Sequence, residues 1–169
     1  QELAELRAKP SGFIPAITEI AHAIRDMPKP LWQLALVYLF QWYAMFIYWQ
    51  YVSHSVAQSA WGATMENKQA YQEAVAWTGL VNGFYNIVTF VSAFWLVKMT
   101  YKYAPKWVHA ICLLMAAAAL LIFPHITNKY LLFIPMIGFG IAWASMMGVP
   151  YLMAVAEIPK ERYGVYMGI

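Results

Sequence analysis

Long stretches without charge dominate the pattern of this sequence. Four stretches contain no Asp, Glu, Lys or Arg: residues 31–65, 74–97, 107–128 and 130–156. A helix needs about 20 apolar residues to cross the ~30 Å hydrocarbon core of a membrane. The stretches are continuously apolar instead of alternating, which argues against a transmembrane β-barrel. We therefore predict an all-α membrane protein with four transmembrane helices, at about 31–56, 74–97, 107–124 and 130–156.

A shorter amphipathic segment precedes the first predicted span. Its apolar residues recur every three or four positions, as they do on one face of a helix: Phe13, Ile17, Ile20, Ile24 and Met27. Pro15 suits a first helical turn, and Pro28 ends the segment. We predict that residues 1–30 form a cytoplasmic loop with a short amphipathic helix on the membrane surface or against a neighbouring loop. An ordered linker without a further role is the alternative.

Composition agrees with a membrane protein and excludes other classes. Charged residues make up 11% of the chain, whereas a soluble domain carries about 25%. The net charge of +3 comes without a basic patch, which argues against nucleic-acid binding. The single cysteine, Cys112, rules out an internal disulfide, and we interpret it as a small apolar residue inside a helix.

Basic residues predict the orientation. The segment before the first span, the loop at 98–106 and the tail after residue 156 together hold nine of the eleven Lys and Arg residues, and the two other loops hold only Lys68 and Lys129. Cytoplasmic loops carry the excess of Lys and Arg. We expect a multi-pass protein of the plasma membrane with both chain ends in the cytoplasm. Because the chain starts without Met and stops at Ile169 in an apolar run, we also expect a piece of a longer protein.

The spans lack the groups on which most chemistry depends. No charged residue lies inside them, so we expect the carboxylate of any ion-coupled transport to lie elsewhere. No phosphate loop, metalloprotease motif or nucleophile turn is present, and the sequence predicts no enzyme, no cofactor and no metal site. We interpret His54, His109 and His125 as histidines near the ends of helices, at the membrane interface, instead of as proton relays or metal ligands.

Neutral polar and aromatic side chains within the spans are the candidates for a ligand site. Trp42 and Trp49 are seven residues apart, and Asn82 and Asn86 are four apart, so each pair shares one face of a helix. Such amides either pair between helices or line a water-filled site, where they bind hydroxyl groups while aromatic faces cover the C–H groups of a sugar. The candidate substrate-binding residues are Gln41, Trp42, Trp49, Asn82, Asn86, Trp143 and Tyr151.

The positions of these candidates along their spans support a common site. Gln41 and Trp42 lie about ten residues, or ~15 Å, into the first span, which is near the midplane of a ~30 Å core. Asn82 and Asn86 lie at a similar depth in the second span. In the fourth span, Gly148-Val149-Pro150 predicts a broken helix, as at a transporter site, or a plain kink.

The end of the fourth span resembles a known family. The sequence reads Gly138-Phe-Gly-Ile-Ala-Trp-Ala-Ser, then Val149-Pro-Tyr-Leu-Met, then Glu157-Ile-Pro-Lys-Glu-Arg-Tyr-Gly-Val-Tyr-Met-Gly-Ile169. These runs are similar to the sucrose-transporter branch of the glycoside–cation symporters, within the major facilitator superfamily. The segment 53–62 lacks the Asp of the eukaryotic members and so resembles the bacterial members. The resemblance implies that the spans are the seventh to tenth of twelve helices in a bacterial inner membrane.

The resemblance also implies a function. It predicts a secondary active transporter that takes up a disaccharide or glucoside, sucrose- or maltose-like, together with protons by alternating access. Its partners would be the sugar, protons, the lipid bilayer, and the first half and last two helices of the same protein. The alternatives are a membrane-embedded enzyme or a non-transporting membrane subunit. The tail after the fourth span is then expected to act as a gating loop through Glu157, Pro159, Arg162 and Gly164.

Overall fold

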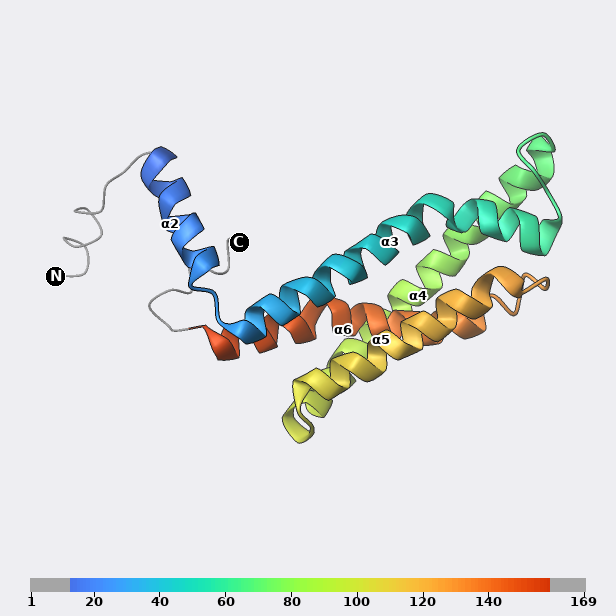
Figure 1. The fold of residues 1–169 in the computed structure, drawn as a ribbon. Helices are drawn as coiled ribbons and strands as arrows, with labels where there is room; N and C mark the ends of the chain where they lie inside the picture. The colour runs from blue at the N-terminus through green and yellow to red at the C-terminus, as the bar shows by residue number, and fades with distance from the viewer. Residues whose placement is uncertain (1–12, 159–169) are drawn as a thin grey trace. The chain divides into compact units, whose positions relative to one another are not determined.

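The computed structural model describes residues 13–158, and this part of the chain is helical without a strand. Its helices are α2 (Phe13–Arg25), α3 (Lys29–Trp61), α4 (Lys68–Lys102), α5 (Pro105–Ile122) and α6 (Phe133–Glu157), with the short 3₁₀ helix η1 (Phe123–His125) after α5 (Figure 1). Four of them, α3 to α6, are long and apolar enough to span a membrane. The prediction of an all-α protein with four such helices is confirmed.

The helices α3 and α4 extend past their predicted spans at both ends, whereas the ends of α5 and α6 lie within three residues of the predicted ones. The helix α3 has 33 residues and α4 has 35, so at 1.5 Å per residue each is roughly 50 Å long. The charge-free windows predict only the segment that fits the ~30 Å hydrocarbon core. A helix continues beyond that core because its backbone hydrogen bonds are as good in the interface as in lipid.

The described residues fall into two compact parts, 37–153 and the flanking segments 13–36 and 154–158. The flanking part contains α2, a helix at the place where the sequence predicts an amphipathic one. Its residues Ile17 and Ile20 are exposed, and Thr18 Oγ1 donates to the Ile14 carbonyl oxygen over 3.0 Å.

Local signals set where the long helices begin and end. Gly62 follows α3 with a φ of 57°, a left-handed conformation that favours glycine, and the N–H of Ala63 donates back to Ala57. The side chain of Asn67 accepts from the Ala70 N–H and caps α4. Pro105 stands at the start of α5, where its missing N–H has no helical partner to lose.

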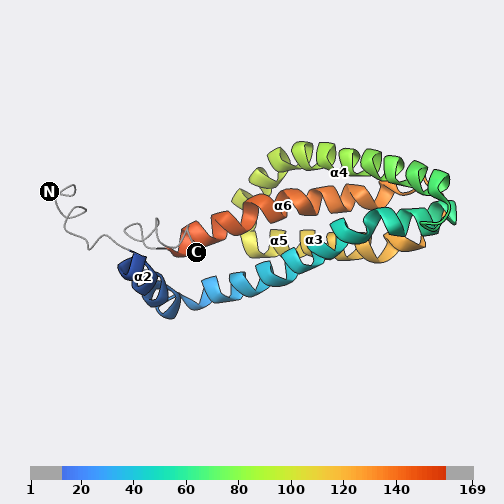
Figure 2. The same ribbon diagram turned by 90° about the horizontal axis from the view of Figure 1, so that it is seen from above.

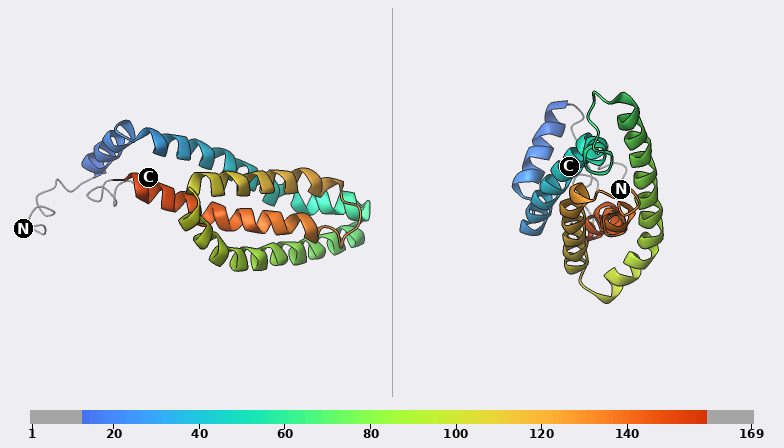
Figure 3. Two further views of the ribbon diagram at one scale, coloured as in Figure 1. Left: turned by 90° about the horizontal axis from the view of Figure 1, so that it is seen from below. Right: turned by 90° about the vertical axis from the view of Figure 1, so that its right-hand side faces the viewer.

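The helix α6 is the centre of the four-helix arrangement. It lies between α4 and α5 (Figures 2 and 3). Gly140 of α6 packs so closely on α4 that an added Cβ would stand 2.6 Å from the Tyr85 carbonyl oxygen. Thr89 Oγ1 of α4 donates to the Gly140 carbonyl oxygen over 2.9 Å. Small residues let two backbones approach in this way in membrane helices.

Of the two expectations for the fourth span, a break or a plain kink, the break is absent, because α6 continues through Pro150. Proline has no N–H, so the carbonyl group of Met146, four residues earlier, loses its helical partner. The hydroxyl group of Tyr38 on α3 donates to this Met146 carbonyl oxygen over 3.5 Å. A neighbouring helix therefore satisfies the freed group, and the helix persists.

Candidate functional site

Three indole rings from two helices meet at the middle of the bundle. The ring centre of Trp143 on α6 lies 6.1 Å from that of Trp42 and 5.6 Å from that of Trp49, both on α3. The rings of Trp42 and Trp49 are 6.2 Å apart. The Trp143 ring is nearly perpendicular to both others, at 82° and 81°. Aromatic rings prefer such edge-to-face contacts. We call Trp42, Trp49 and Trp143 the indole cluster.

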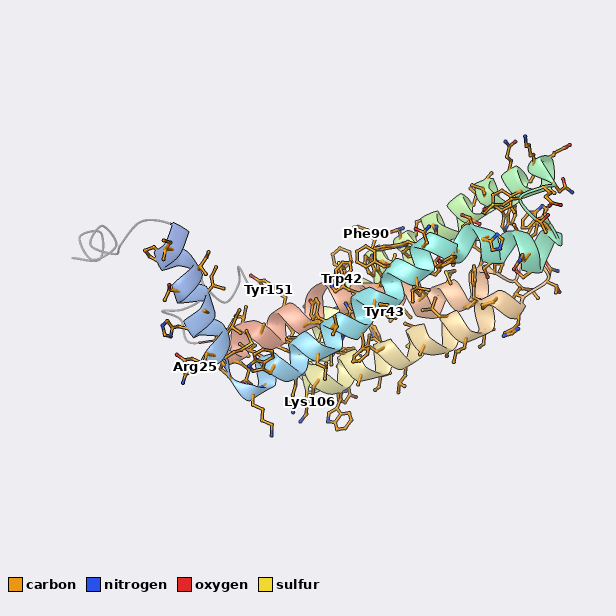
Figure 4. The ribbon with its side chains drawn as sticks, turned by 45° about the horizontal axis from the view of Figure 1, so that its top comes forward. Arg25, Trp42, Tyr43, Phe90, Lys106 and Tyr151 are labelled. Atoms are coloured by element: carbon orange, nitrogen blue, oxygen red, sulfur yellow. The ribbon has the colours of Figure 1, made fainter. Side chains whose placement is uncertain are left out.

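The indole cluster is not covered within the described part of the chain. Trp49 is 40% exposed, and Trp42 and Trp143 are half-buried. Phe46, one turn from both tryptophans of α3, contacts them at 6.3 Å and 6.0 Å and is itself exposed. Figure 4 marks Trp42 midway along α3. The cluster therefore offers ring surface at the depth where the sequence predicts a ligand site.

The two asparagines of α4 are engaged differently from each other. Asn82 Oδ1 accepts a hydrogen bond of 2.6 Å from the Tyr48 hydroxyl group on α3. Asn86 is exposed, and its Nδ2 donates to the Asn82 backbone oxygen over 2.8 Å. Asn82 thus links two helices, as one of the two sequence interpretations has it. Asn86, in contrast, is exposed and its hydrogen bond stays within α4.

Tyr48 is a residue that the candidate set omits. It is 6% exposed, and its ring packs 4.7 Å from that of Phe139 on α6. Its position seven residues after Gln41 on the same helix face is the signal that could have included it. Through Tyr48, the position of Asn82 is fixed by both α3 and α6.

Gln41 is the most unusual polar residue of the candidate set. It is 5% exposed, and neither of its amide atoms has a hydrogen-bond partner among the described residues. A buried polar group without a partner costs about 1–3 kcal/mol. Such a group is expected to be satisfied by water or a ligand, and Gln41 is adjacent in sequence to Trp42 of the indole cluster.

The remaining candidates are not brought into the cluster. Tyr151, two turns after Trp143, is 57% exposed and lies near the C-terminal end of α6 (Figure 4), with no ring contact to the indoles in the described part of the structure. Glu157 is the exposed last residue of α6. The gating-loop residues Pro159, Arg162 and Gly164 lie outside the described residues.

A groove of about 360 Å³ runs between α3 and the C-terminal end of α5. Its lining is almost wholly apolar and contains none of the candidate residues: Tyr43, Ala44, Ile47, Tyr48, Tyr51, Val52, Ser55, Leu120, Phe123 and Pro124. A sugar needs several convergent polar groups. The groove is therefore no alternative position for the sugar site that the sequence predicts.

His109 lies near the start of α5, as the sequence indicates, but it is buried against the neighbouring helix instead of facing water. His109 is 4% exposed, and its Nδ1 lies 3.0 Å from Ser145 Oγ of α6, which is fully buried. A serine beside a histidine is also the start of a nucleophilic arrangement. Because Ser145 is fully buried in this state, no substrate reaches Oγ, and the pair lends no support to the enzyme alternative.

In the loop between α5 and α6, at the other end of α5 from His109, a lysine lies among aromatic rings. Lys129 Nζ lies 4.8 Å from the ring centre of Trp77, 5.6 Å from that of Trp61 and 5.3 Å from that of Tyr130. Trp77 Nε1 also donates to the Lys129 carbonyl oxygen over 3.0 Å. These cation–π contacts hold the loop between α5 and α6 on the ends of α3 and α4.

Comparison with protein-family models, curated proteins and solved structures finds no match. Among the described residues, no three His, Cys, Asp or Glu side chains are placed to hold a metal ion. The chemistry of the site therefore has to be argued from the indole cluster and its neighbouring amides.

Proposed function

We propose that this chain is part of a secondary active transporter that takes up a disaccharide or glucoside, sucrose- or maltose-like, with protons. The helices α3 to α6 would be the seventh to tenth helices of a major facilitator protein in a bacterial inner membrane. The first half of such a protein would supply the charged groups that couple sugar to protons. Both ends of the present chain would lie in the cytoplasm.

The indole cluster is the observation that carries this proposal. Rings from α3 and α6 meet at one level with uncovered surface, and packing alone gives no reason to leave them so. The faces of a pyranose ring are lined by C–H groups, which pack on aromatic rings. Its hydroxyl groups need amides, and the exposed Asn86 lies at similar depth. Gln41 is unpartnered but buried in this state, so it would reach a sugar only in a state that opens at this level.

Alternating access suits the arrangement. Substrate sites of this transporter class lie near the bilayer midplane between two halves. A second half placed over the uncovered side of the indole cluster would enclose a sugar between aromatic faces. It would also exclude water from the amides, which strengthens their hydrogen bonds to the hydroxyl groups.

Uptake of labelled sucrose and maltose into vesicles containing the protein tests the proposal. Uptake should rise with an inward proton gradient and fall when a protonophore removes the gradient. Trp143→Ala should weaken sugar binding, and Trp143→Phe should retain part of it. Trp107→Ala is the matched control, because Trp107 is an exposed indole of α5 outside the indole cluster.

The amides give a second, quantitative test. Losing a hydroxyl partner in a buried site costs ~1–3 kcal/mol, so Asn86→Leu should weaken binding by roughly five- to more than a hundredfold. Gln58→Leu, which removes an exposed amide of α3 away from the indole cluster, should leave binding unchanged. Equal binding of both sugars by wild type, Trp143→Ala and Asn86→Leu would rule out the site, and absence of uptake would favour a non-transporting subunit.

A further inference from the structure

The pair of His109 and Ser145 is a contact of a titratable side chain that α5 and α6 bury between them. His109 lies four residues after the start of α5, about 6 Å along its axis. Its Nδ1 is 3.0 Å from Ser145 Oγ, while its Nε2 is buried and has no hydrogen-bond partner. Cys112, one turn further along α5, is also buried and also interacts with the Ser145 side chain.

Other ionisable groups do not compensate this imidazole. From α6 the facing group is Ser145, which carries no charge. The nearby titratable groups of the other helices at this end are Tyr38 of α3, whose hydroxyl group is bonded to Met146, and lysines of the α4 and α5 ends. Those lysines are exposed: Lys98, Lys102 and Lys106. A charge on His109 would therefore stand without a counter-ion.

An ionisable residue inside a membrane-spanning bundle is costly and usually functional. An imidazole that served packing alone would be expected to satisfy both nitrogen atoms or to be replaced by an apolar residue. Here Nδ1 is held in place by Ser145, whereas the buried Nε2 has no hydrogen-bond partner among the described residues. We propose that His109 and Ser145 form a proton-binding site between α5 and α6.

The site takes up one proton without any other change of bonds. In the tautomer that donates from Nδ1 to Ser145 Oγ, Nε2 carries a lone pair with no donor. A hydronium ion gives its proton to Nε2 and leaves as water. The resulting imidazolium keeps its Nδ1–H bond to Ser145, and its new Nε2–H needs an acceptor, which water supplies.

Proton uptake is therefore linked to access of water at this level of the bundle. The buried state described here suits the neutral ring, because a buried charge without a partner is expensive. A state in which α5 and α6 separate near His109 hydrates Nε2 and suits the imidazolium. Each proton bound by one state and not by the other shifts their ratio by up to tenfold per pH unit.

Under the proposed function, this linkage would make the cytoplasmic side of the transporter, near the start of α5, open more readily in acid. That role rests on the proposed function, whereas the proton site itself does not. Proton binding by His109 is accordingly tested without sugar.

The rate at which Cys112 reacts with N-ethylmaleimide reports the opening. Cys112 is the single cysteine of the chain and is buried one turn from His109. The protein in nanodiscs is alkylated between pH 8 and pH 5.5. The rate at each pH is divided by the rate for His109→Gln, a variant whose amide can hydrogen-bond to Ser145 but takes up no proton. This division removes the pH dependence that comes from ionisation of the Cys112 thiol itself. The ratio should rise toward low pH, by up to tenfold per unit.

His125→Gln is the matched control, because His125 is an exposed histidine just after α5. This variant should keep the wild-type pH dependence. A rate ratio that stays constant from pH 8 to pH 5.5 would overturn the proposal.

A second measurement decides the matter if His109→Gln fails to fold. Replacing His22, His54 and His125 by Gln leaves His109 as the sole imidazole of the chain. Its ring ¹⁵N shifts should change from those of a neutral ring to those of an imidazolium between pH 8 and pH 5. A ring that stays neutral throughout would refute proton binding, whereas a titrating ring in a protein that moves no sugar would refute only the proposed function.

Discussion

Replacing Gly140 by Ala tests the closest contact between the helices. The new Cβ would stand 2.6 Å from the Tyr85 carbonyl oxygen and 2.8 Å from Val88 Cβ. Ordinary contact begins at 3.4 Å, so α4 and α6 would have to separate by about 0.8 Å. The hydrogen bond from Thr89 to the Gly140 carbonyl oxygen, now 2.9 Å long, would be stretched beyond its useful range.

The magnitude follows from these two effects. Overpacking costs typically 1–3 kcal/mol, and an interhelical hydrogen bond in a membrane protein contributes ~0.6 kcal/mol. We therefore expect Gly140→Ala to lower the free energy of unfolding by about 1.5–3.5 kcal/mol. The assay is reversible unfolding with SDS in mixed micelles, followed by circular dichroism.

Two glycines on the same helix provide the controls. A Cβ on Gly148 would meet nothing within 4 Å, and one on Gly138 would stand 3.6 Å from the Met115 carbonyl oxygen. Gly148→Ala should be neutral or stabilise by up to ~1 kcal/mol, because alanine is the better helix former. If Gly140→Ala unfolds at the same SDS concentration as Gly148→Ala, the close approach of α4 and α6 is wrong.

Three further predictions concern single contacts. Tyr38→Phe should lower the free energy of unfolding by ~0.6 kcal/mol. In a protein that already carries Pro150→Ala, which restores a helical donor to the Met146 carbonyl group, Tyr38→Phe should have no effect. An equal loss in both backgrounds would contradict the role of Tyr38. Lys129→Met should destabilise by roughly 0.5–1 kcal/mol per lost cation–π contact in the SDS assay, whereas Lys68→Met, on an exposed residue, should not. Lys102→Cys should resist impermeant thiol reagents applied to intact cells, and rapid labelling from outside would reverse the orientation.

Helix number and type follow from the sequence because they depend on composition over about 20 residues. Lipid cannot satisfy backbone groups, so a long charge-free stretch has to be a helix. The amphipathic period before Pro28 likewise predicts α2. The same signals say less about helix ends, since Gly62 and Asn67 act through local geometry outside the charge-free windows.

The candidate site was partly visible in the sequence for a similar reason. The spacing of Trp42 and Trp49 places both on one face of α3, and a common depth suggests that Trp143 meets them. Which partner each amide has depends on the rotation of α4 against α3, which no spacing within one helix determines. Tyr48 therefore pairs with Asn82 and leaves Asn86 at the surface.

That this chain makes long apolar helices follows from its sequence, because each segment and its solvent suffice for that outcome. The unbroken course of α6 through Pro150 and the burial of His109 come from the packing of the helices. Both depend on a group from another helix, the hydroxyl groups of Tyr38 and Ser145. The environment of a polar group inside a membrane bundle depends on the group that it contacts, and in both cases here that group is far away in the sequence.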